Sequence, residues 1–219
     1  MSTCDAGGAR AAGSAFVRLS VMISPAPHES DARDGLAGLP ARLSALPPSC
    51  GRTRLVAVDG HAGSGKSTLA GRLAAALGGA PLVRLDDLAS HEALFDWTDR
   101  LTAGVLDPLS RDEPARYPAY DWERRAFTRT VTFPPAPVVL IEGVGAGRRA
   151  VRPFLAFLVW LRVPAETAWA RGRERDGPEL AGFWREWVSA ERRHFAEDPS
   201  EPHADILMTP RGDSYDACE

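Results

Sequence analysis

Short runs of apolar residues recur along the chain, and they predict strands that are buried on both faces. The clearest runs are LVAV at 55–58 and VVLI at 138–141, and further strands are expected at 81–85, 157–163 and 204–208. Strands of a parallel sheet read as continuous apolar runs because helices cover both faces of the sheet. The pattern therefore predicts a mostly parallel sheet of about five strands.

Between these runs, apolar residues at helical spacing predict helices that cover the sheet. The segment STLAGRLAAAL, which begins at Ser67, is rich in Ala and Leu, and both residues favour helix. An alternation of strands and helices is typical of a three-layer α/β/α sandwich, and the whole pattern predicts this fold. Further helices are expected at 34–46, 94–109, 148–154, 165–175 and 179–197.

The helix expected at 179–197 carries a long apolar stripe. Trp184 and Trp187 belong to this stripe, and we expect them to be core residues rather than ligand contacts. Glu191 and His194 lie near its edge, where a solvated or hydrogen-bonded structural position is the common outcome.

The composition indicates one ordinary globular domain. The chain has 219 residues, of which 44% are hydrophobic and 25% charged, and this suffices for a packed core. We expect a single domain at 31–210, preceded at 1–30 by a disordered tail that is rich in Ala, Gly, Ser and Pro. The polar segment 211–219 is expected to be a frayed C-terminal tail.

Charge and cysteine content argue against several kinds of partner and site. The net charge of −3 gives no global attraction to nucleic acid or to an anionic membrane, so neither is expected as a partner. The three cysteines are isolated in sequence, which suits neither a metal site nor a disulfide framework and favours a reducing cytoplasm. No apolar run approaches the ~20 residues that a membrane-spanning helix needs.

The strongest motif is a glycine-rich loop between a predicted strand and a predicted helix. GHAGSGKS at 60–67 matches the P-loop pattern G-x-x-x-x-G-K-[ST] in full. Its glycines let successive backbone N–H groups face one anion, and the N-terminal end of the following helix attracts that anion. Lys66 would reach the β/γ-phosphates of ATP, and the Ser67 hydroxyl would bind Mg²⁺. The predicted nucleotide-binding residues are Gly60, Ala62, Gly63, Ser64, Gly65, Lys66, Ser67 and Thr68.

Acidic residues follow two of the predicted strands. Asp86 and Asp87 come after the strand at 81–85, and Glu142 ends the strand at 138–141. Ligands of open α/β sheets bind outside the carboxyl ends of the strands, so these acids are positioned for chemistry. One Asp could instead cap a helix, with the other left for the site. Glu142 stands where a Walker B carboxylate would hold Mg²⁺, and the P-loop upstream favours this over a helix cap.

The segment RDEPARYPAYDWERR at 111–125 has two prolines and little periodicity, which predicts a long irregular loop. Its aromatic residues, Tyr117, Tyr120 and Trp122, argue against disorder. We interpret it as a substrate-facing segment with Asp121 as its polar tip. A surface loop that its aromatic residues hold in place is the alternative.

Basic residues cluster on the helix expected at 165–175. Arg171 and Arg175 are one turn apart and share a face, so their guanidinium groups could clamp phosphates during transfer. The alternative is an exposed basic helix end that interacts with its own dipole and with Asp176.

With these residues placed, the chain from 55 to 208 resembles the uridine kinase-like branch of P-loop kinases. This branch includes uridine-cytidine, nicotinamide riboside and pantothenate kinases. The segments that carry the resemblance are GHAGSGKS at 60–67, LDDL at 85–88, YDW at 120–122, VVLIEG at 138–143 and ETAWARGRERD at 166–176.

The resemblance implies an ATP-dependent kinase that moves a phosphoryl group to a hydroxyl of a small molecule, with a nucleoside-like acceptor favoured. By this resemblance Asp86 is the base or the orienting group for that hydroxyl. The resemblance also implies that Arg171 and Arg175 belong to a short lid over the ATP phosphates, and that Asp121, between Tyr120 and Trp122, holds hydroxyls of the substrate. Asp87 is included as a further substrate-binding candidate.

One departure from the family weakens the link to uridine. Uridine kinases usually follow the strand-end Asp with a Phe-Tyr pair, whereas this chain has Leu88 and Ala89. Two rival hypotheses remain. A GTPase is disfavoured because no Asn-Lys-x-Asp motif follows the strand at 138–141. The other rival is an ATP-binding regulatory module, or an ATPase, that has no small-molecule kinase activity.

Overall fold

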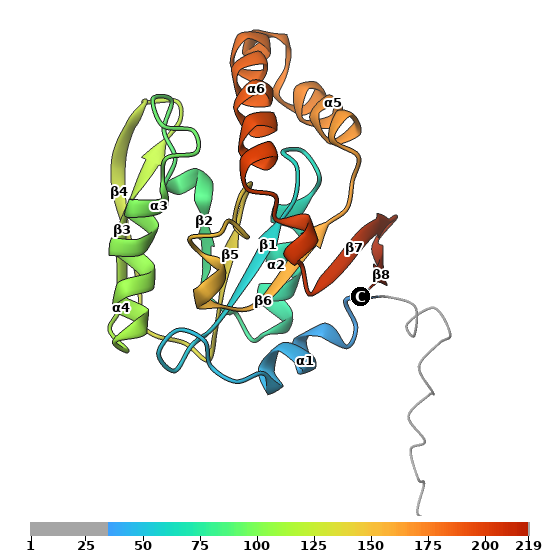
Figure 1. Ribbon diagram of the computed structural model, residues 1–219. Coiled ribbons are helices and arrows are strands. Elements are labelled where there is room, and N and C mark those ends of the chain that lie inside the picture. Colours follow the sequence, from blue (N-terminus) through green and yellow to red (C-terminus); the bar gives the residue numbers. More distant parts are fainter. Residues whose placement is uncertain (1–34, 219) are drawn as a thin grey trace, which may run out of the picture.

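A six-stranded, mostly parallel sheet forms the centre of the computed structural model, which describes residues 35–218 (Figure 1). The strand order is β2-β5-β1-β6-β7-β8; the first five are parallel, and β8 pairs antiparallel with β7. The predicted tail at 1–30 lies outside the described residues. The strands are β1 (Arg54–Asp59), β2 (Leu82–Arg84), β5 (Val138–Glu142), β6 (Leu155–Leu161), β7 (Ile206–Arg211) and β8 (Ser214–Cys218).

Helices cover both faces of this sheet and complete three layers. On one face, α1 and α2 bury Leu43 and Leu73 in a cluster that contains Val56 of β1. On the other face, the continuous helix formed by α3, η3 and α4 buries Leu101 in a second cluster with Leu55 of β1. The predicted three-layer α/β/α fold is confirmed. The elements are α1 (Leu39–Ala45), α2 (Lys66–Ala76), α3 (Thr98–Leu101), the π-helical η3 (Thr102–Leu106) and α4 (Asp107–Ser110).

Two further helices, α5 (Ala165–Asp176) and α6 (Ala181–Glu197), lie beyond the carboxyl ends of the central strands, next to the loop between β1 and α2 (Figure 1). They pack on each other through an aromatic cluster that contains Trp169, Trp184 and Trp187. None of the helices within 35–218 is long and apolar enough to cross a membrane. Short 3₁₀ turns complete the chain as η2 (Leu85–Asp87), η4 (Arg152–Phe154), η5 (Pro178–Leu180) and η6 (Glu201–His203).

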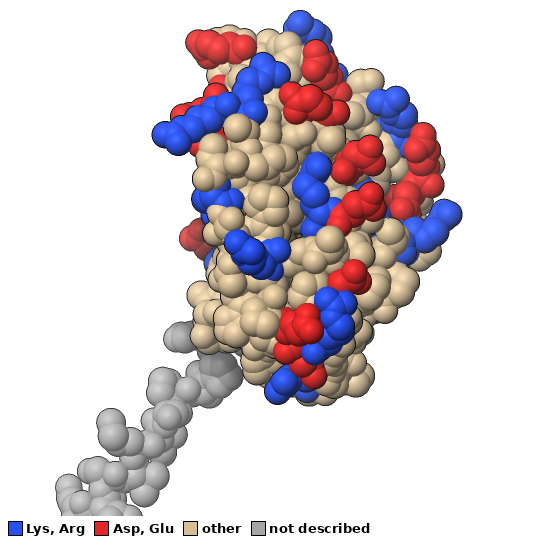
Figure 2. All heavy atoms as spheres, turned by 90° about the vertical axis from the view of Figure 1, so that its left-hand side faces the viewer, with Lys and Arg blue, Asp and Glu red and all other residues tan. Residues whose placement is uncertain are grey.

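The prediction of an irregular loop at 111–125 is wrong. Most of this segment is β3 (Ala115–Asp121), which forms an antiparallel pair with β4 (Ala126–Phe133). In β3, Ala115, Tyr117 and Ala119 are buried while the residues between them are exposed, which is strand alternation. A proline lacks the N–H of a ladder hydrogen bond but is tolerated at the edge of a sheet, and both strands of a two-stranded sheet are edges. The prolines of the segment argued against a strand, and for this reason the alternation was not recognised in the sequence. Figure 2 shows this side of the molecule, with acidic and basic side chains interspersed.

The C-terminal segment also differs from the expectation of a frayed tail. Residues 214–218 form β8, which extends the sheet, and the side chain of Tyr215 is 6% exposed. A two-residue turn joins β7 to β8, and Gly212 in this turn has φ +57°, a conformation that glycine adopts readily. β8 is short and rich in polar residues, so its sequence alone did not indicate a strand; its pairing with β7 and the packing of Tyr215 in the core depend on distant parts of the chain.

Candidate functional site

The P-loop, residues 60–67, runs from the end of β1 to the start of α2. Lys66 is 7% exposed, and its Nζ donates a hydrogen bond to the carbonyl oxygen of His61 at 2.9 Å. Gly63 has φ +82°, and a Cβ here would lie 2.1 Å from the carbonyl oxygen of Ala168 in α5. Only glycine therefore lets the P-loop pack directly on the backbone of α5.

Two adjoining cavities open along the P-loop. The main cavity has a volume of about 430 Å³, and the smaller phosphate cavity has a volume of about 190 Å³. Gly60 and Ser64 line neither cavity, although both were predicted to bind nucleotide. The predicted residues that line the main cavity are Ala62, Gly63, Lys66, Ser67, Asp86, Trp122, Glu142 and Arg175. Those that line the phosphate cavity are Gly63, Gly65, Lys66, Ser67, Thr68, Arg171 and Arg175.

Ser67 and Glu142, the predicted magnesium ligands, are brought together. The Ser67 hydroxyl donates a hydrogen bond to Oε1 of Glu142 at 3.1 Å, and Arg84 Nε lies 3.7 Å from the same oxygen. Glu142 is 3% exposed; burial raises the pKa of its carboxyl, and the charge of Lys66 opposes this shift. Hard oxygen ligands of this kind fit Mg²⁺. No group of three or more His, Cys, Asp or Glu side chains within 35–218 forms a metal site, so phosphates or water would have to complete the coordination.

Asp86 stands in η2, directly after β2, and its exposed side chain lines the main cavity. The protein that surrounds the carboxyl on its other sides raises its pKa, against the lowering effect of the Lys66 charge, and Asp87 raises it further. The backbone at this position is held in place because Trp122 Nε1 donates a hydrogen bond to the carbonyl oxygen of Asp86 at 3.1 Å. The strand end thus presents a carboxylate to the same cavity as Lys66.

The two neighbouring acids have different environments. Asp87 does not line the main cavity, and its Oδ1 accepts a hydrogen bond from Arg129 of β4 at 2.8 Å. Neither acid caps the helix that follows, because α3 begins at Thr98 with Trp97 as its N-cap and has no side-chain cap hydrogen bond. The structure therefore separates them: Asp86 faces the cavity, whereas Asp87 attaches the β3–β4 hairpin to the sheet.

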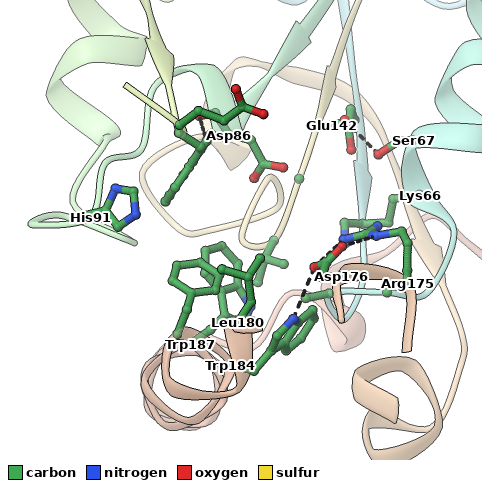
Figure 3. Close-up of a pocket in the computed structure, with 17 residues that line it drawn as sticks. Lys66, Ser67, Asp86, His91, Glu142, Arg175, Asp176, Leu180, Trp184 and Trp187 are labelled. Carbon is green, nitrogen blue, oxygen red and sulfur yellow. Dashed lines mark hydrogen bonds and ion pairs between the residues drawn. The ribbon is translucent and has the colours of Figure 1, made fainter. Parts of the chain in front are cut away.

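The main cavity has a polar end and an aromatic end (Figure 3). Lys66, Ser67 and Glu142 lie on one side, and His91 lies across the cavity from them. The aromatic end is formed mainly by α6 and by the turn before it. Its lining residues are Trp122, Val144, Leu180, Phe183, Trp184 and Trp187. Trp184 and Trp187, which were expected to be core, are 3% and 7% exposed and still present part of their rings to the cavity.

The predicted arginine pair lies over the P-loop. Arg171 and Arg175 of α5 both line the phosphate cavity, and Arg175 also lines the main one. The Arg175 guanidinium binds the Asp176 carboxylate at 2.6 and 3.0 Å, which raises the pKa of Arg175. Trp184 Nε1 donates a hydrogen bond to the same carboxylate at 3.1 Å. The alternative of a helix end that only satisfies Asp176 is therefore incomplete, because Arg175 also faces the P-loop.

Of the three predicted substrate residues on β3 and its turn, only Trp122 lines the main cavity. Asp121 accepts hydrogen bonds from the backbone N–H groups of Glu123 and Arg124 at 3.1 and 2.9 Å, so its carboxylate closes the hairpin turn. The Tyr120 hydroxyl lies 3.0 Å from Nδ1 of His91, behind the cavity wall. A role for Asp121 and Tyr120 in substrate binding stays a prediction.

A second set of polar groups holds the P-loop in place: sequence reasoning missed Asp59 and expected for Glu191 a solvated or hydrogen-bonded position, without its partners. Asp59, at the end of β1, is fully buried and accepts hydrogen bonds from the backbone N–H groups of Gly60, Gly145 and Gly147 at 2.7 to 2.9 Å. Glu191 of α6 is likewise buried and contacts the next P-loop residues. The available signal was a charged residue inside an apolar pattern, because such a residue needs hydrogen-bonding partners if it is buried.

Comparisons with known proteins agree with this geometry. A protein-family model described as an AAA domain matches residues 56–192. A protein from Bacillus stearothermophilus, provisionally described as a uridine kinase, is 22% identical with a TM-score of 0.59, over 82% of this chain and 99% of that chain. No curated protein sequence matches this chain significantly.

Two further solved structures are similar. One, from Silicibacter sp. TM1040, is provisionally described as a fructose transport system kinase; it is 25% identical with a TM-score of 0.50, over 77% of this chain and 91% of that chain. The other is D-glycerate 3-kinase from Cryptococcus neoformans, 13% identical with a TM-score of 0.51, over 80% of this chain and 92% of that chain. Together these structures show that the fold is one that P-loop kinases adopt.

Proposed function

This chain belongs to the P-loop family whose model is described as an AAA domain, and from this premise we propose that it is an ATP-dependent kinase of small molecules. The reaction would move the γ-phosphoryl group of ATP to a hydroxyl of the acceptor. One observation carries the proposal. The same cavity is lined by Lys66 and Ser67 of the P-loop, by the carboxylate of Asp86 and by the side chains of the aromatic end. Such a cavity has room for the γ-phosphate and an acceptor in line.

In this proposal the P-loop holds ATP through charge and backbone amides. Lys66 and the N–H groups of 63–67 would neutralise the β/γ-phosphates, while Ser67 and Glu142 would hold Mg²⁺. The bound magnesium supplies charge neutralisation. Arg171 and Arg175 close over the phosphates from α5 and exclude water, which limits wasteful hydrolysis of ATP.

Asp86 is the proposed catalytic carboxylate for the acceptor. It would accept a hydrogen bond from the acceptor hydroxyl, orient its oxygen towards the γ-phosphate and receive its proton. The raised pKa of the Asp86 carboxyl brings it nearer to the range of an effective proton acceptor. Most of the rate gain in phosphoryl transfer comes from positioning and electrostatic stabilisation, and these residues provide both.

The aromatic end of the main cavity supports a nucleoside-like acceptor with a flat ring. Trp122, Phe183, Trp184 and Trp187 line this end, and aromatic faces favour stacking with flat, apolar groups. Among the described residues that line the main cavity, the only Lys and Arg are Lys66 and Arg175. Figure 3 shows both on the phosphate side of the cavity, so a small anionic acid would find no cationic partner at the aromatic end.

The first test is ADP release from ATP and Mg²⁺ with a panel of nucleosides, other ribosides, pantothenate, sugars and glycerate, with product masses checked. We expect ADP release that depends on one ring-bearing acceptor, which gains one phosphate. Lys66 is the only lysine in the chain, so an amine-reactive probe followed by mass spectrometry reports nucleotide binding there. ATP should protect Lys66 from this probe.

Asp86→Asn and Asp87→Asn form a matched pair of neighbouring acids. We expect Asp86→Asn to abolish turnover while ATP still protects Lys66, because Asn cannot receive the proton. Asp87→Asn should keep turnover, since Asp87 lies outside the main cavity and binds Arg129. ADP release without any acceptor would contradict the kinase proposal in favour of an ATPase. ATP binding without ADP release would favour a regulatory module instead.

A further inference from the structure

A single carboxylate in α6 accepts hydrogen bonds from both the P-loop and α5. Glu191 is fully buried, and each of its oxygens accepts two hydrogen bonds. Oε1 lies 2.7 Å from Nδ1 of His61 and 2.9 Å from Nε1 of Trp169. Oε2 lies 3.2 Å from the backbone N of Ala62 and 2.8 Å from Nε1 of Trp187.

This arrangement requires the ionised side chain of Glu191. A carboxylate accepts at about four lone-pair positions and donates none, which matches four surrounding donors. A buried charge is costly unless hydrogen bonds compensate it. Burial raises the pKa of Glu191, but the hydrogen bonds from His61, Trp187 and Trp169 and the charge of Lys66 outweigh burial, so the pKa is lowered overall.

The donors to Glu191 come from three functional parts of the protein. His61 and Ala62 are the second and third residues of the P-loop, and Trp169 belongs to α5, the helix that carries the arginine pair. Trp187 lines the aromatic end of the main cavity. The His61 backbone carbonyl also accepts the hydrogen bond from Lys66 Nζ, so the residue whose ring binds Glu191 also positions the catalytic lysine.

We propose that Glu191 is a positioning residue, which fixes the first half of the P-loop to α5 and α6 and thereby sets the affinity for nucleotide. Glu191 does not touch phosphate itself and lines neither cavity. The inference rests on the proposed function only for the identity of the nucleotide. It gives α6 a second role, in addition to lining the aromatic end of the main cavity.

Glu191→Gln is the sharpest perturbation because it preserves size and removes one acceptor. If the NH₂ group faces Ala62 and Trp187, it meets two fixed donors and both hydrogen bonds are lost. If it faces His61 and Trp169, the His61 ring can adopt the tautomer in which Nδ1 accepts, and the hydrogen bond from Trp169 is lost. Either orientation therefore leaves at least one buried donor without its acceptor. We expect the affinity for a non-hydrolysable ATP analogue, measured in the presence of Mg²⁺, to fall about tenfold or more in the Glu191→Gln variant.

Two controls separate positioning from general loss of stability. Glu186→Gln changes an exposed acid in the same helix and should leave nucleotide affinity unchanged. Leu109→Ala removes a fully buried side chain of α4, away from the P-loop, and should lower the melting temperature without weakening nucleotide binding. All affinities are compared at a temperature where each variant is folded by circular dichroism.

The sole lysine supplies a readout that needs no ligand. If Glu191 fixes His61, then Glu191→Gln frees Lys66 from the His61 carbonyl, and an amine-reactive probe should label Lys66 several-fold faster than in Glu186→Gln or Leu109→Ala. Unchanged labelling in Glu191→Gln, or unchanged affinity where the wild type binds nucleotide, overturns the inference. A wild type that binds no ATP overturns the proposed function instead, while the labelling rate still tests Glu191.

Discussion

Gly172 in α5 offers a test of the packing that shapes the main cavity. The residue is buried on the helix face that contacts α6. A Cβ at this position would lie 2.2 and 2.4 Å from Cη2 and Cζ2 of Trp184. Trp184 is 3% exposed and its Nε1 is hydrogen-bonded to Asp176, so the ring can move only towards the main cavity, which would break this hydrogen bond. Gly172→Ala should therefore push Trp184 out of place.

The expected magnitude follows from opposing terms. Alanine is favoured over glycine in a helix interior by about 1 kcal/mol. Overpacking of a filled core costs about 1 to 3 kcal/mol, and loss of the Trp184–Asp176 hydrogen bond adds about 1 kcal/mol. Packing therefore outweighs helix propensity, and we expect Gly172→Ala to lower the free energy of unfolding by about 1 to 3 kcal/mol.

Gly71→Ala is the matched control because Gly71 also lies in a helix, α2, but a Cβ there would meet no atom within 4 Å. We expect this variant to gain about 0.5 to 1 kcal/mol of stability from helix propensity alone. Urea denaturation measures both variants against the wild type, and thermal melting should show shifts of opposite sign, about 2 to 4 °C per kcal/mol for a protein of this size. Equal stabilisation by the two substitutions would refute the packing argument.

Three further changes test other parts of the structure. Asp59→Asn replaces an acceptor oxygen with an NH₂ group next to backbone donors such as Gly147 N–H, and should cost about 1 to 3 kcal/mol in urea denaturation. Burial lowers the pKa of His194 from 6.5 to about 4, so the unfolded chain binds a proton more readily than the folded protein. The protein therefore loses stability as the pH falls from 6.5 towards 4. Between pH 7.5 and 4.5, the unfolding free energy of His194→Phe should fall by about 2 kcal/mol less than that of the wild type. Ending the chain after Arg211 removes β8 with buried Tyr215 and should lower the unfolding free energy by at least about 2 kcal/mol, whereas a frayed tail predicts no change.

The sequence predicted the parts of the site that depend on short segments of chain. A glycine-rich loop between a strand and a helix has few ways to fold, and the carboxyl ends of parallel strands meet at one edge of the sheet. For this reason Lys66, Ser67, Asp86 and Glu142 could be assigned to one cavity before the structure was known, and all four line it. Their proposed chemical roles stay predictions.

The aromatic end of the main cavity could not be predicted from the sequence. Hydrophobic periodicity indicates which residues are buried, but it does not distinguish a ring packed in the core from a ring that lines a cavity. Trp184 and Trp187 satisfy both descriptions, since each is nearly buried and each lines the main cavity. The β3–β4 hairpin was missed for a related reason. Its alternation spans only a few residues, and Pro118 interrupts a pattern that becomes clear beside β4.

Asp59 and Glu191 show how little the sequence says about contacts between distant residues. Each is a charged residue in an apolar pattern, which indicates that partners exist but not where they lie along the chain. The partners of Asp59 in the turn after β5 are 86 and 88 residues away, and His61 is 130 residues from Glu191. Only the fold brings these groups together.

The two buried carboxylates act on neighbouring parts of one loop. Asp59 accepts from the N–H of Gly60, and Glu191 accepts from the ring of His61 and the N–H of Ala62, so three consecutive P-loop residues are held from two sides. A glycine-rich loop has high conformational freedom, which would cost affinity if the loop had to be ordered by its ligand. Two buried acceptors that order the loop in advance remove part of that cost, and this explains why charged residues occupy positions that packing alone would give to apolar ones.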